Sequence, residues 1–507
     1  MKNFKKSQKL ENVKYAIRGR LMEEANKLEQ NGNSILKLNI GNPAVFNFSA
    51  PNSILESMKN NLEHSQGYSD SKGLKIAREA IIKYYKGKNV NDLALDDIFI
   101  GNGVSELILM SMQALLNPDD EILVPMPDYP LWTASVNLAG GKAVHYICDE
   151  NNEWYPNISD IKSKITKNTK GIIIINPNNP TGALYPEKIL KQIVDIAKKN
   201  ELIIFADEIY DRLIFDGLEH ISIASLSKDV PVVTFSGLSK SHMVAGFRIG
   251  WMCITGNRES IKDYINGLNL LSSMRLCANV PGQNIIADAI TDNNSIKALL
   301  KKGGRLYEQR ECIYNELNNI PGISVVKPKA AFYIFPKIDV SKFNIVNDEI
   351  FALDFLRSKH ILFINGTGFN WKEQNHFRLV YLAIHHIIKY RGNFLYESDL
   401  KASNEEIIED IESIIKYLEE TILIDYTGTA EKFRDILIDK KIGKSTKKDQ
   451  IIEMFKYDKS QKSILSAVVS AIIGYKFDLN KIFDDEISDA SVSFSEEIEN
   501  EDIIKEK

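Results

Sequence analysis

The middle third of the chain contains three short runs that are almost wholly apolar, at residues 171–175, 202–206 and 232–235. Strands of a parallel sheet have such sequences, because helices cover both of their faces and neither face needs polar side chains. Residues 186–199 begin with a proline and are rich in Lys, Ile and Val, which favours a helix between the first two runs. The pattern therefore predicts a strand–helix–strand unit and an α/β fold.

A polar segment follows each of these strands, at residues 176–182, 207–210 and 236–240. A further strand, expected at 98–100, runs into Gly101-Asn-Gly103 and then into a helix. In open α/β sheets, ligands bind beyond the carboxyl ends of the strands. We therefore expect these four segments to form one ligand-binding site.

The pattern changes near residue 292, where a helix is followed by mixed segments. Residues 330–335 and 376–380 have the composition of strands in a smaller domain. The expected division is an N-terminal arm with part of the small domain at 1–45, the large domain at 46–290, the small domain at 291–421 with an extra stretch at about 383–400, and a C-terminal extension at 422–507. Because the end of this extension is acidic and polar, we expect it to be partly disordered.

Composition and charge exclude several classes of protein. The chain has 507 residues, of which 44% are hydrophobic and 26% charged, enough for a core of ordinary size. Its 63 Lys and Arg against 68 Asp and Glu are too balanced for a dedicated nucleic-acid binder. The four cysteines are scattered without a Cys-x-x-Cys pair, which argues against a disulfide framework or a zinc site. No apolar stretch reaches the ~20 residues that cross a bilayer. We therefore expect a soluble, cytoplasmic protein with no metal, membrane or nucleic-acid partner.

Lys240 and Asp207 are the main candidates for chemistry. Partial desolvation of Lys240 beside Gly237 and Ser239 would lower the pKa of its amine and prepare it for Schiff-base formation with a carbonyl. A solvated loop lysine is the plainer interpretation. Asp207 ends an apolar strand, where a carboxylate needs a partner: a protonated pyridine nitrogen, a helix N-terminus or an ion pair. Tyr210 could bring a phenol to the same ligand or belong to the core.

Other residues suit anionic groups. The turn at 101–105 is not a complete G-x-G-x-x-G motif, because Glu106 occupies the last glycine position. It can still present backbone N–H groups and the Ser105 hydroxyl to a phosphate. Arg248 supplies a fixed cation suited to a phosphate dianion. Arg378, in the middle of an apolar strand, suits either a ligand carboxylate or an internal Asp or Glu partner.

Eight motifs occur in order along the chain: Leu38-Asn-Ile-Gly-Asn-Pro43, Gln66-Gly-Tyr-Ser-Asp-Ser-Lys-Gly73, Gly101-Asn-Gly-Val-Ser-Glu106, Pro127-Asp-Tyr-Pro-Leu-Trp132, Ile175-Asn-Pro-Asn-Asn-Pro-Thr-Gly182, Asp207-Glu-Ile-Tyr210, Gly237-Leu-Ser-Lys-x5-Gly-Phe-Arg248 and Arg275-Leu-Cys-Ala-Asn-Val-Pro281. Together they resemble the class-I aminotransferases of the fold-type-I pyridoxal-phosphate enzymes, and among these the bacterial glutamate–pyruvate (alanine) aminotransferases. The likeness covers about residues 10–380.

The resemblance implies a large domain with a mostly parallel sheet sandwiched by helices, a smaller α+β domain, and a homodimer with shared active sites. It also implies pyridoxal 5′-phosphate as cofactor, bound covalently by Lys240. Asp207 would pair with the pyridinium nitrogen. The other implied contacts are Tyr210 and Asn179 at the phenolic oxygen, Tyr129 stacked on the ring, Gly103, Val104, Ser105 and Arg248 at the phosphate, Tyr68 at the phosphate of the second subunit, and Gly41, Arg378 and Asn179 at the substrate carboxylate.

The sequence departs from this family pattern in three places. Gly237 stands where many relatives carry a serine, so Ser236 or Ser239 must supply any hydroxyl contact there. An extra stretch follows Tyr381, and the residues beyond about 424 have no counterpart in the family.

The implied activity is a ping-pong exchange of the amino group between alanine/pyruvate and glutamate/2-oxoglutarate. An aminotransferase for aromatic or branched donors and a C–S β-lyase remain alternatives. A transcription regulator built on the same domain is disfavoured, because only about 35 residues precede Leu36 and these cannot form a DNA-binding module.

Overall fold

The computed structural model describes residues 3–11, 13, 19–292 and 294–382. The predictions for the extra stretch at about 383–400, the end of the small domain and the extension at 422–507 lie outside the described residues.

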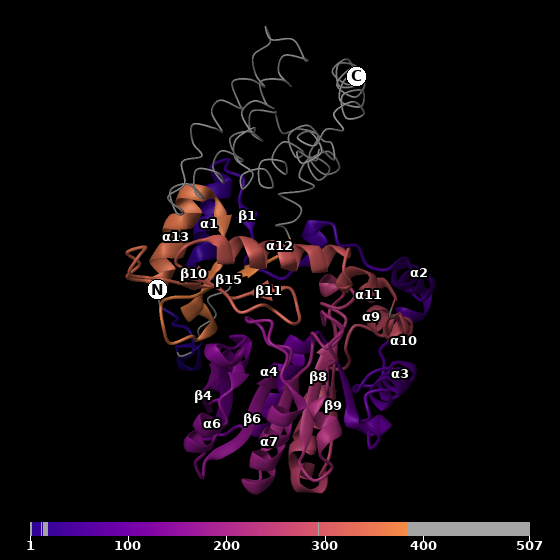
Figure 1. Ribbon diagram of the computed structural model, residues 1–507. Coiled ribbons are helices and arrows are strands. Elements are labelled where there is room, and N and C mark those ends of the chain that lie inside the picture. Colours follow the sequence, from indigo (N-terminus) through magenta and orange to yellow (C-terminus); the bar gives the residue numbers. More distant parts are fainter. Residues whose placement is uncertain (1–2, 12, 14–18, 293, 383–507) are drawn as a thin grey trace, which may run out of the picture. The chain divides into compact units, whose positions relative to one another are not determined.

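An eight-stranded sheet organises the described chain (Figure 1). Its strands are β2 (Ile98–Asn102), β3 (Glu121–Met126), β4 (Lys142–Asp149), β5 (Tyr155–Pro156), β6 (Thr169–Ile175), β7 (Ile203–Asp207), β8 (Val232–Gly237) and β9 (Ile249–Thr255). The strand order is β2-β9-β8-β7-β6-β3-β4-β5. The neighbours from β8 to β4 pair in parallel, whereas β9 is antiparallel to β2 and β8, and β5 is antiparallel to β4. The α/β fold with a mostly parallel sheet is thus confirmed.

Thirteen α-helices accompany the strands in the described residues. They are α1 (Arg20–Gln30), α2 (Asn52–Asn60), α3 (Lys75–Lys86), α4 (Val104–Leu115), α5 (Leu131–Leu138), α6 (Ile158–Lys164), α7 (Glu187–Lys199), α8 (Lys262–Met274), α9 (Val280–Asn284), α10 (Ile286–Thr291), α11 (Asn294–Leu300), α12 (Arg305–Asn319) and α13 (Asp348–Lys359). None has the length and apolarity that a membrane crossing requires.

The apolar runs form strands that are buried on both faces. On one face, alternate residues such as Ile173, Phe205 and Phe235 join apolar side chains of α4, α5 and α8 in one hydrophobic core. Residues of the opposite face, such as Ile172 and Ile204, are also buried. The predicted strand–helix–strand unit is present as β6, α7 and β7. Helix α7 buries apolar residues at helical spacing, including Leu190, Ile193, Val194 and Ala197.

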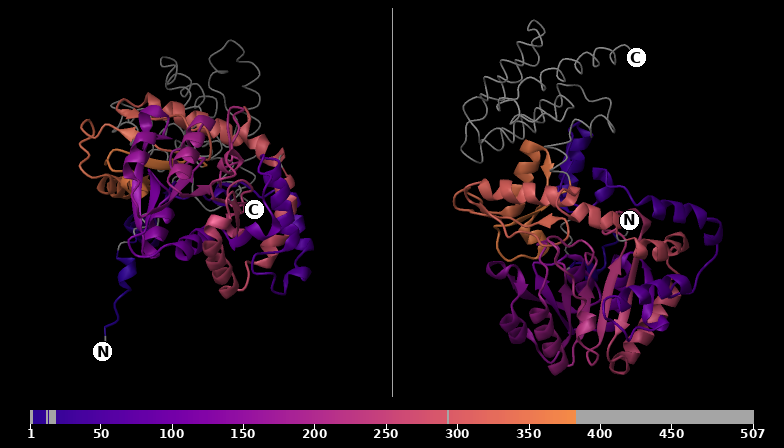
Figure 2. Two further views of the ribbon diagram at one scale, coloured as in Figure 1. Left: turned by 90° about the horizontal axis from the view of Figure 1, so that it is seen from below. Right: turned by 45° about the vertical axis from the view of Figure 1, so that its right-hand side comes forward.

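Shorter strands and several helices gather beyond one end of this sheet, as Figures 1 and 2 show. Here β1 (Leu36–Lys37) pairs in parallel with β13 (Ile361–Leu362), and β10 (Ile323–Ser324) pairs with β12 (Lys337–Ile338). A three-stranded sheet contains β11 (Tyr333–Ile334), β15 (Phe377–Val380) and β14 (Ile364–Asn365).

The expected strand at 330–335 is shorter than predicted, since only residues 333–334 are in β11. Ala331 has a positive φ of 63°, which interrupts the extended backbone. The N–H groups of Ala330 and Ala331 donate instead to Gly182 and Leu213. The apolar composition of this segment thus reflects burial against the loops that follow β6 and β7 as much as strand pairing.

Candidate functional site

The polar segments converge at the carboxyl ends of adjacent strands. Asn179 follows β6, Asp207 ends β7, and Ser239 and Lys240 follow β8. In the sheet register Asp207 lies beside Ile175 of β6 and Phe235 of β8. The residues predicted from these segments are therefore neighbours, as the sheet topology requires.

Lys240 is partly buried, and its amine contacts the N-terminal segment of the chain. Its Nζ donates a hydrogen bond to the backbone carbonyl of Gly41 at 2.7 Å. Burial, together with the positive charges of Arg378 and Arg248, lowers the pKa of Lys240 to about 8. An amine with this pKa is substantially neutral in mildly alkaline solution, so its lone pair is available to attack a carbonyl.

Asp207 is 3% exposed and receives two neutral hydrogen-bond donors. The indole N–H of Trp132 donates to Oδ2 at 3.0 Å, and the backbone N–H of Ile209 donates to Oδ1 at 3.3 Å. Burial raises the pKa of Asp207 to about 6 despite these bonds. A protonated pyridine nitrogen would offset this burial with a positive charge, so the site fits the ring of pyridoxal phosphate.

Trp132 was not among the predicted site residues, although it closes the Pro127–Trp132 motif. It lies in α5, three residues after Tyr129, and its backbone N–H donates to the Tyr129 carbonyl at 3.0 Å. Tyr129 is partly buried against the hydrophobic core. The turn between β3 and α5 therefore presents the tyrosine expected to stack on the ring, and the first turn of α5 presents the donor to Asp207.

Tyr210 and Arg378 both contact Tyr333, a second residue that was not among the predicted site residues. The phenol of Tyr210 donates to the Tyr333 hydroxyl at 2.7 Å, and the Arg378 guanidinium lies 4.5 Å from the Tyr333 ring centroid. Burial raises the pKa of Tyr210 well above its usual value, so its hydroxyl stays protonated. Tyr333 belongs to the apolar segment 330–335, where nothing in the sequence distinguishes it from a core residue.

Arg378 is 2% exposed and contacts residues from two distant segments. Its guanidinium donates to the Asn179 side-chain oxygen at 3.0 Å and to the backbone carbonyl of Asn39. The acceptors are neutral oxygens, and the planar fork matches a carboxylate. Arg378, Asn179 and the Gly41 region thus lie together, as expected for a carboxylate-binding pocket.

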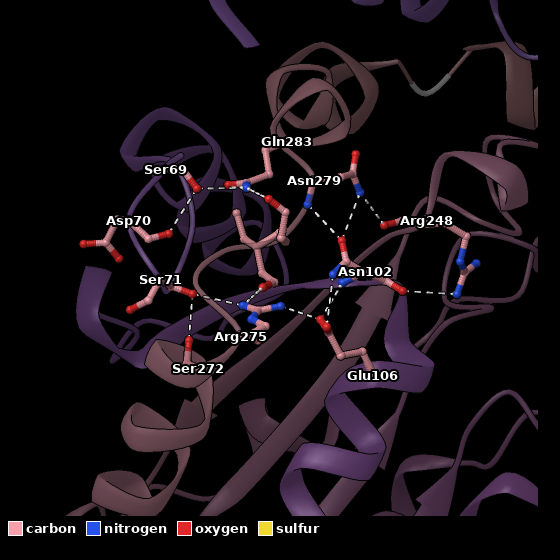
Figure 3. Close-up of polar contacts among 12 residues, drawn as sticks. Ser69, Asp70, Ser71, Asn102, Glu106, Arg248, Ser272, Arg275, Asn279 and Gln283 are labelled. Atoms are coloured by element: carbon pink, nitrogen blue, oxygen red, sulfur yellow. Dashed lines mark hydrogen bonds and ion pairs between the residues drawn. The ribbon is translucent and has the colours of Figure 1, made fainter. Parts of the chain in front are cut away.

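The turn from β2 to α4 lies beside Arg248, which donates to the Asn102 carbonyl at the end of β2 (Figure 3). Gly103 has a positive φ of 83°, and a Cβ there would overlap the Arg248 guanidinium. Arg248 donates to the carbonyls of Ala245 at 2.9 Å and Asn102 at 3.2 Å. The N–H groups of Val104 and Ser105 open α4, so a helix N-terminus and a cation face the same turn. This arrangement suits a phosphate.

Two predicted residues are less tied to the cluster. Ser239 is 8% exposed and directly precedes Lys240. Tyr68 is 82% exposed, so its phenol points to the surface of the chain. Within the ranges that the structure describes, no group of three or more His, Cys, Asp or Glu side chains could hold a metal ion.

Comparisons with known proteins show what the chain is similar to. The family described as aminotransferase class I and II matches residues 33–387. A glutamate-pyruvate aminotransferase, AlaA, of Escherichia coli K12 is 55% identical over 382 residues, which are 75% of this chain and 94% of the relative. An alanine aminotransferase of Mycobacterium tuberculosis H37Rv is 50% identical over 397 residues, or 77% of this chain and 92% of the relative. The crystal structure of an aminotransferase from E. coli, 55% identical, superposes with a TM-score of 0.74 and covers 75% of this chain and 94% of its own.

The buried carboxylate should destabilise the cofactor-free protein. Because the pKa of Asp207 rises from 3.8 to about 6, the folded protein retains a proton that the unfolded chain has already lost in this window. Stability therefore falls as the pH rises from about 4 to 6, and the full cost of roughly 3 kcal/mol persists above pH 6. We expect Asp207→Asn to raise the free energy of unfolding by up to about that amount at pH 8, and progressively less toward pH 4.

Urea unfolding of the cofactor-free proteins at several pH values measures this difference. Asp195→Asn, on the exposed face of α7, is the matched control and should leave stability nearly unchanged. If Asp207→Asn raised the free energy of unfolding by the same amount at pH 8 and near pH 4, the destabilisation would not come from ionisation of Asp207.

Proposed function

Because the chain belongs to the class I and II aminotransferases, enzymes whose cofactor is pyridoxal 5′-phosphate, we propose that it transfers the amino group between alanine/pyruvate and glutamate/2-oxoglutarate. The observation that carries the proposal is the convergence of the Lys240 amine, the Asp207 carboxylate and the Arg378 guanidinium on one edge of the sheet. The choice of alanine and glutamate is supported by the names of the relatives that are at least half identical to this chain.

The site geometry supports a set of proposed cofactor-binding residues. Asp207 would receive the ring nitrogen, Tyr129 would cover the ring, and Tyr210 with Asn179 would contact its phenolic oxygen. The phosphate would lie at the α4 N-terminus with Arg248, where Ser236 or Ser239 would supply a hydroxyl in place of the side chain that Gly237 lacks. When bound, pyridoxal phosphate supplies an electron-accepting ring that stabilises negative charge at the substrate Cα.

Arg378 and Lys240 perform the steps that belong to the protein. Arg378 binds the α-carboxylate through two parallel hydrogen bonds and so holds the substrate Cα–H bond at a fixed angle. Lys240 Nζ, neutral in mildly alkaline solution because its pKa is about 8, then accepts the Cα proton as a general base and can return it as an acid. Arg378 is buried and Lys240 is partly buried, so both groups act where contact with bulk water is reduced.

We also propose a homodimer in which Tyr68 reaches the phosphate of the partner subunit. Tyr68 is 82% exposed, and three residues at the end of α8 or just beyond it are exposed as well: Leu270, Met274 and Leu276. The segment after Tyr68 lies against this helix, since the Ser272 hydroxyl donates to the Ser71 carbonyl at 2.7 Å. Exposed apolar residues grouped in this way favour a contact with a second copy.

The division into a large domain at 46–290 and a small domain built from 1–45 and 291–421 remains part of the proposal. The parallel pairing of β1 with β13 supports it, because it joins the N-terminal segment to the later residues rather than to the large sheet. The four cysteines are scattered along the chain without a Cys-x-x-Cys pair, which favours a reducing, cytoplasmic environment.

The purified protein with pyridoxal phosphate should form pyruvate and glutamate from L-alanine and 2-oxoglutarate. Lys240→Ala should lower this rate by at least about 10²-fold and abolish borohydride trapping of the cofactor on the chain. Lys228→Ala, in an exposed loop, is the matched control. Pyruvate release from L-cystathionine without a keto-acid acceptor, and no turnover of alanine, would identify the β-lyase alternative instead.

Arg378→Lys should lower kcat/KM by about one to two decades, because lysine keeps the charge but loses one of two parallel donors. The values of kcat/KM should fall by similar factors for alanine, glutamate, pyruvate and 2-oxoglutarate. The affinity for the cofactor should stay near that of the wild type. Steady-state kinetics with all four substrates check this, with the exposed Arg357→Lys as control. Impairment with glutamate alone would mean that Arg378 binds a side-chain carboxylate.

Mixing Tyr68→Phe and Lys240→Ala proteins should restore activity at limiting pyridoxal phosphate. A hybrid dimer then has one wholly intact site, which combines Lys240 of one subunit with Tyr68 of the other. Subunit exchange is verified by tags of different mass. If activity never rises above that of the separate parents, Tyr68 acts within its own subunit.

A further inference from the structure

Glu106 places a negative charge in the first turn of α4, the helix whose N-terminus is the proposed phosphate site. It stands at the position where a G-x-G-x-x-G motif would have its last glycine. A carboxylate in the first turn interacts favourably with the helix dipole, but it also repels a phosphate dianion that binds there. A positive charge beside Glu106 would offset this repulsion.

The Glu106 carboxylate holds the end of β2 in place (Figure 3). Its Oε2 accepts the backbone N–H of Asn102 at 2.8 Å, and its Oε1 accepts the Asn102 side-chain amide at 3.0 Å. The backbone carbonyl of Asn102 in turn accepts a hydrogen bond from the Arg248 guanidinium. The side-chain oxygen of Asn102 accepts a hydrogen bond from the backbone N–H of Asn279 at 2.8 Å. Glu106 is thus bonded to the residue that orients the phosphate-binding arginine.

Arg275, which follows α8, forms an ion pair with Glu106. The same guanidinium donates to the carbonyls of Ser71 at 2.9 Å and Ile100 at 2.6 Å. The side chains of Arg275 and Glu106 are only 14% and 28% exposed, so water screens the pair weakly. Arg275 therefore supplies a positive charge directly against the Glu106 carboxylate.

We propose that Arg275 is a positioning residue of the phosphate site: its charge cancels that of Glu106, so that Glu106 can hold Asn102 without repelling the cofactor phosphate. The proposal rests on the proposed function, because it assumes that pyridoxal phosphate binds with its phosphate at the α4 N-terminus. It also explains why the Arg275–Pro281 motif, which contributes none of the predicted cofactor contacts, lies beside this turn.

The test compares two ligands that differ only in the phosphate. Cofactor-free wild-type protein and variants are titrated with pyridoxal phosphate and with pyridoxal, and binding is followed by absorbance. We expect Arg275→Met to lower the affinity for pyridoxal phosphate by roughly ten-fold, because the charge of Glu106 is then uncompensated near a phosphate dianion. The affinity for pyridoxal, which has no phosphate, should stay near that of the wild type. The double variant Glu106→Gln/Arg275→Met has neither charge and should recover most of the lost affinity.

The chain offers a matched control at the other end of β2. Arg258 pairs with Asp97, the residue before β2, at 2.8 Å, and their side chains are 28% and 12% exposed. Arg258→Met thus breaks a similarly buried pair at the end of β2 remote from Asn102, and it should change neither affinity. Arg275→Lys keeps the charge without the planar fork, and we expect its affinity for pyridoxal phosphate to stay within about three-fold of the wild type.

Three outcomes would overturn the proposal. Arg275→Met could bind pyridoxal phosphate as tightly as the wild type, or it could lose affinity equally for pyridoxal phosphate and pyridoxal. The double variant could also bind pyridoxal phosphate as weakly as Arg275→Met. If Arg275→Met does not fold, a ten-fold loss in Arg275→Lys would overturn it and near-normal affinity would support it. Failure of the proposed function is distinguishable, because wild-type protein would then bind both ligands equally or not at all.

Discussion

The burial of one amine and one carboxylate at the same edge of a sheet is the constraint on which this structure depends. Lys240 and Asp207 follow or end neighbouring buried strands, and removal from water disfavours the charged form of each. Their pKa values move toward each other, to about 8 for the amine and about 6 for the carboxylic acid. Such groups are costly to the folded chain but suited to exchange protons with a bound ligand.

The surrounding fold offsets this cost with apolar burial. Strands β7 and β8 are buried along their whole lengths, β6 is buried except at Lys170, and alternate side chains of the three strands join a core with α4, α5 and α8. The polar groups are thus confined to strand ends, where loops can satisfy them. Apolar burial in the middle of the sheet stabilises the fold, and the strand ends are left to carry the polar residues of the proposed site.

Contacts from distant parts of the chain determine the orientation of the site residues. Trp132 supports Asp207 from 75 residues away, Tyr333 supports Tyr210 from 123 residues away, and Arg275 supports Glu106 from 169 residues away. Arg378 reaches back to Asn39, and Lys240 to Gly41, so the N-terminal segment completes the site. The proposed substrate site therefore forms only when the beginning, middle and later parts of the described chain are folded together.

The sequence by itself determined the α/β class, the strands at 171–175, 202–206 and 232–235, and the polar segments that bear Asn179, Asp207 and Lys240. Continuous apolar runs and the residues that follow them are local signals, and parallel strands bring their carboxyl ends together whatever their neighbours. The roles of Trp132, Tyr333 and Arg275 were decided only by the tertiary structure. A buried Trp or Tyr has the same local signal in a core as beside a catalytic group, and the partner of an arginine is set by packing between helices and strands that the sequence does not place. The exposed position of Tyr68 likewise follows from the fold, since its sequence context does not distinguish a buried phenol from one that faces solvent.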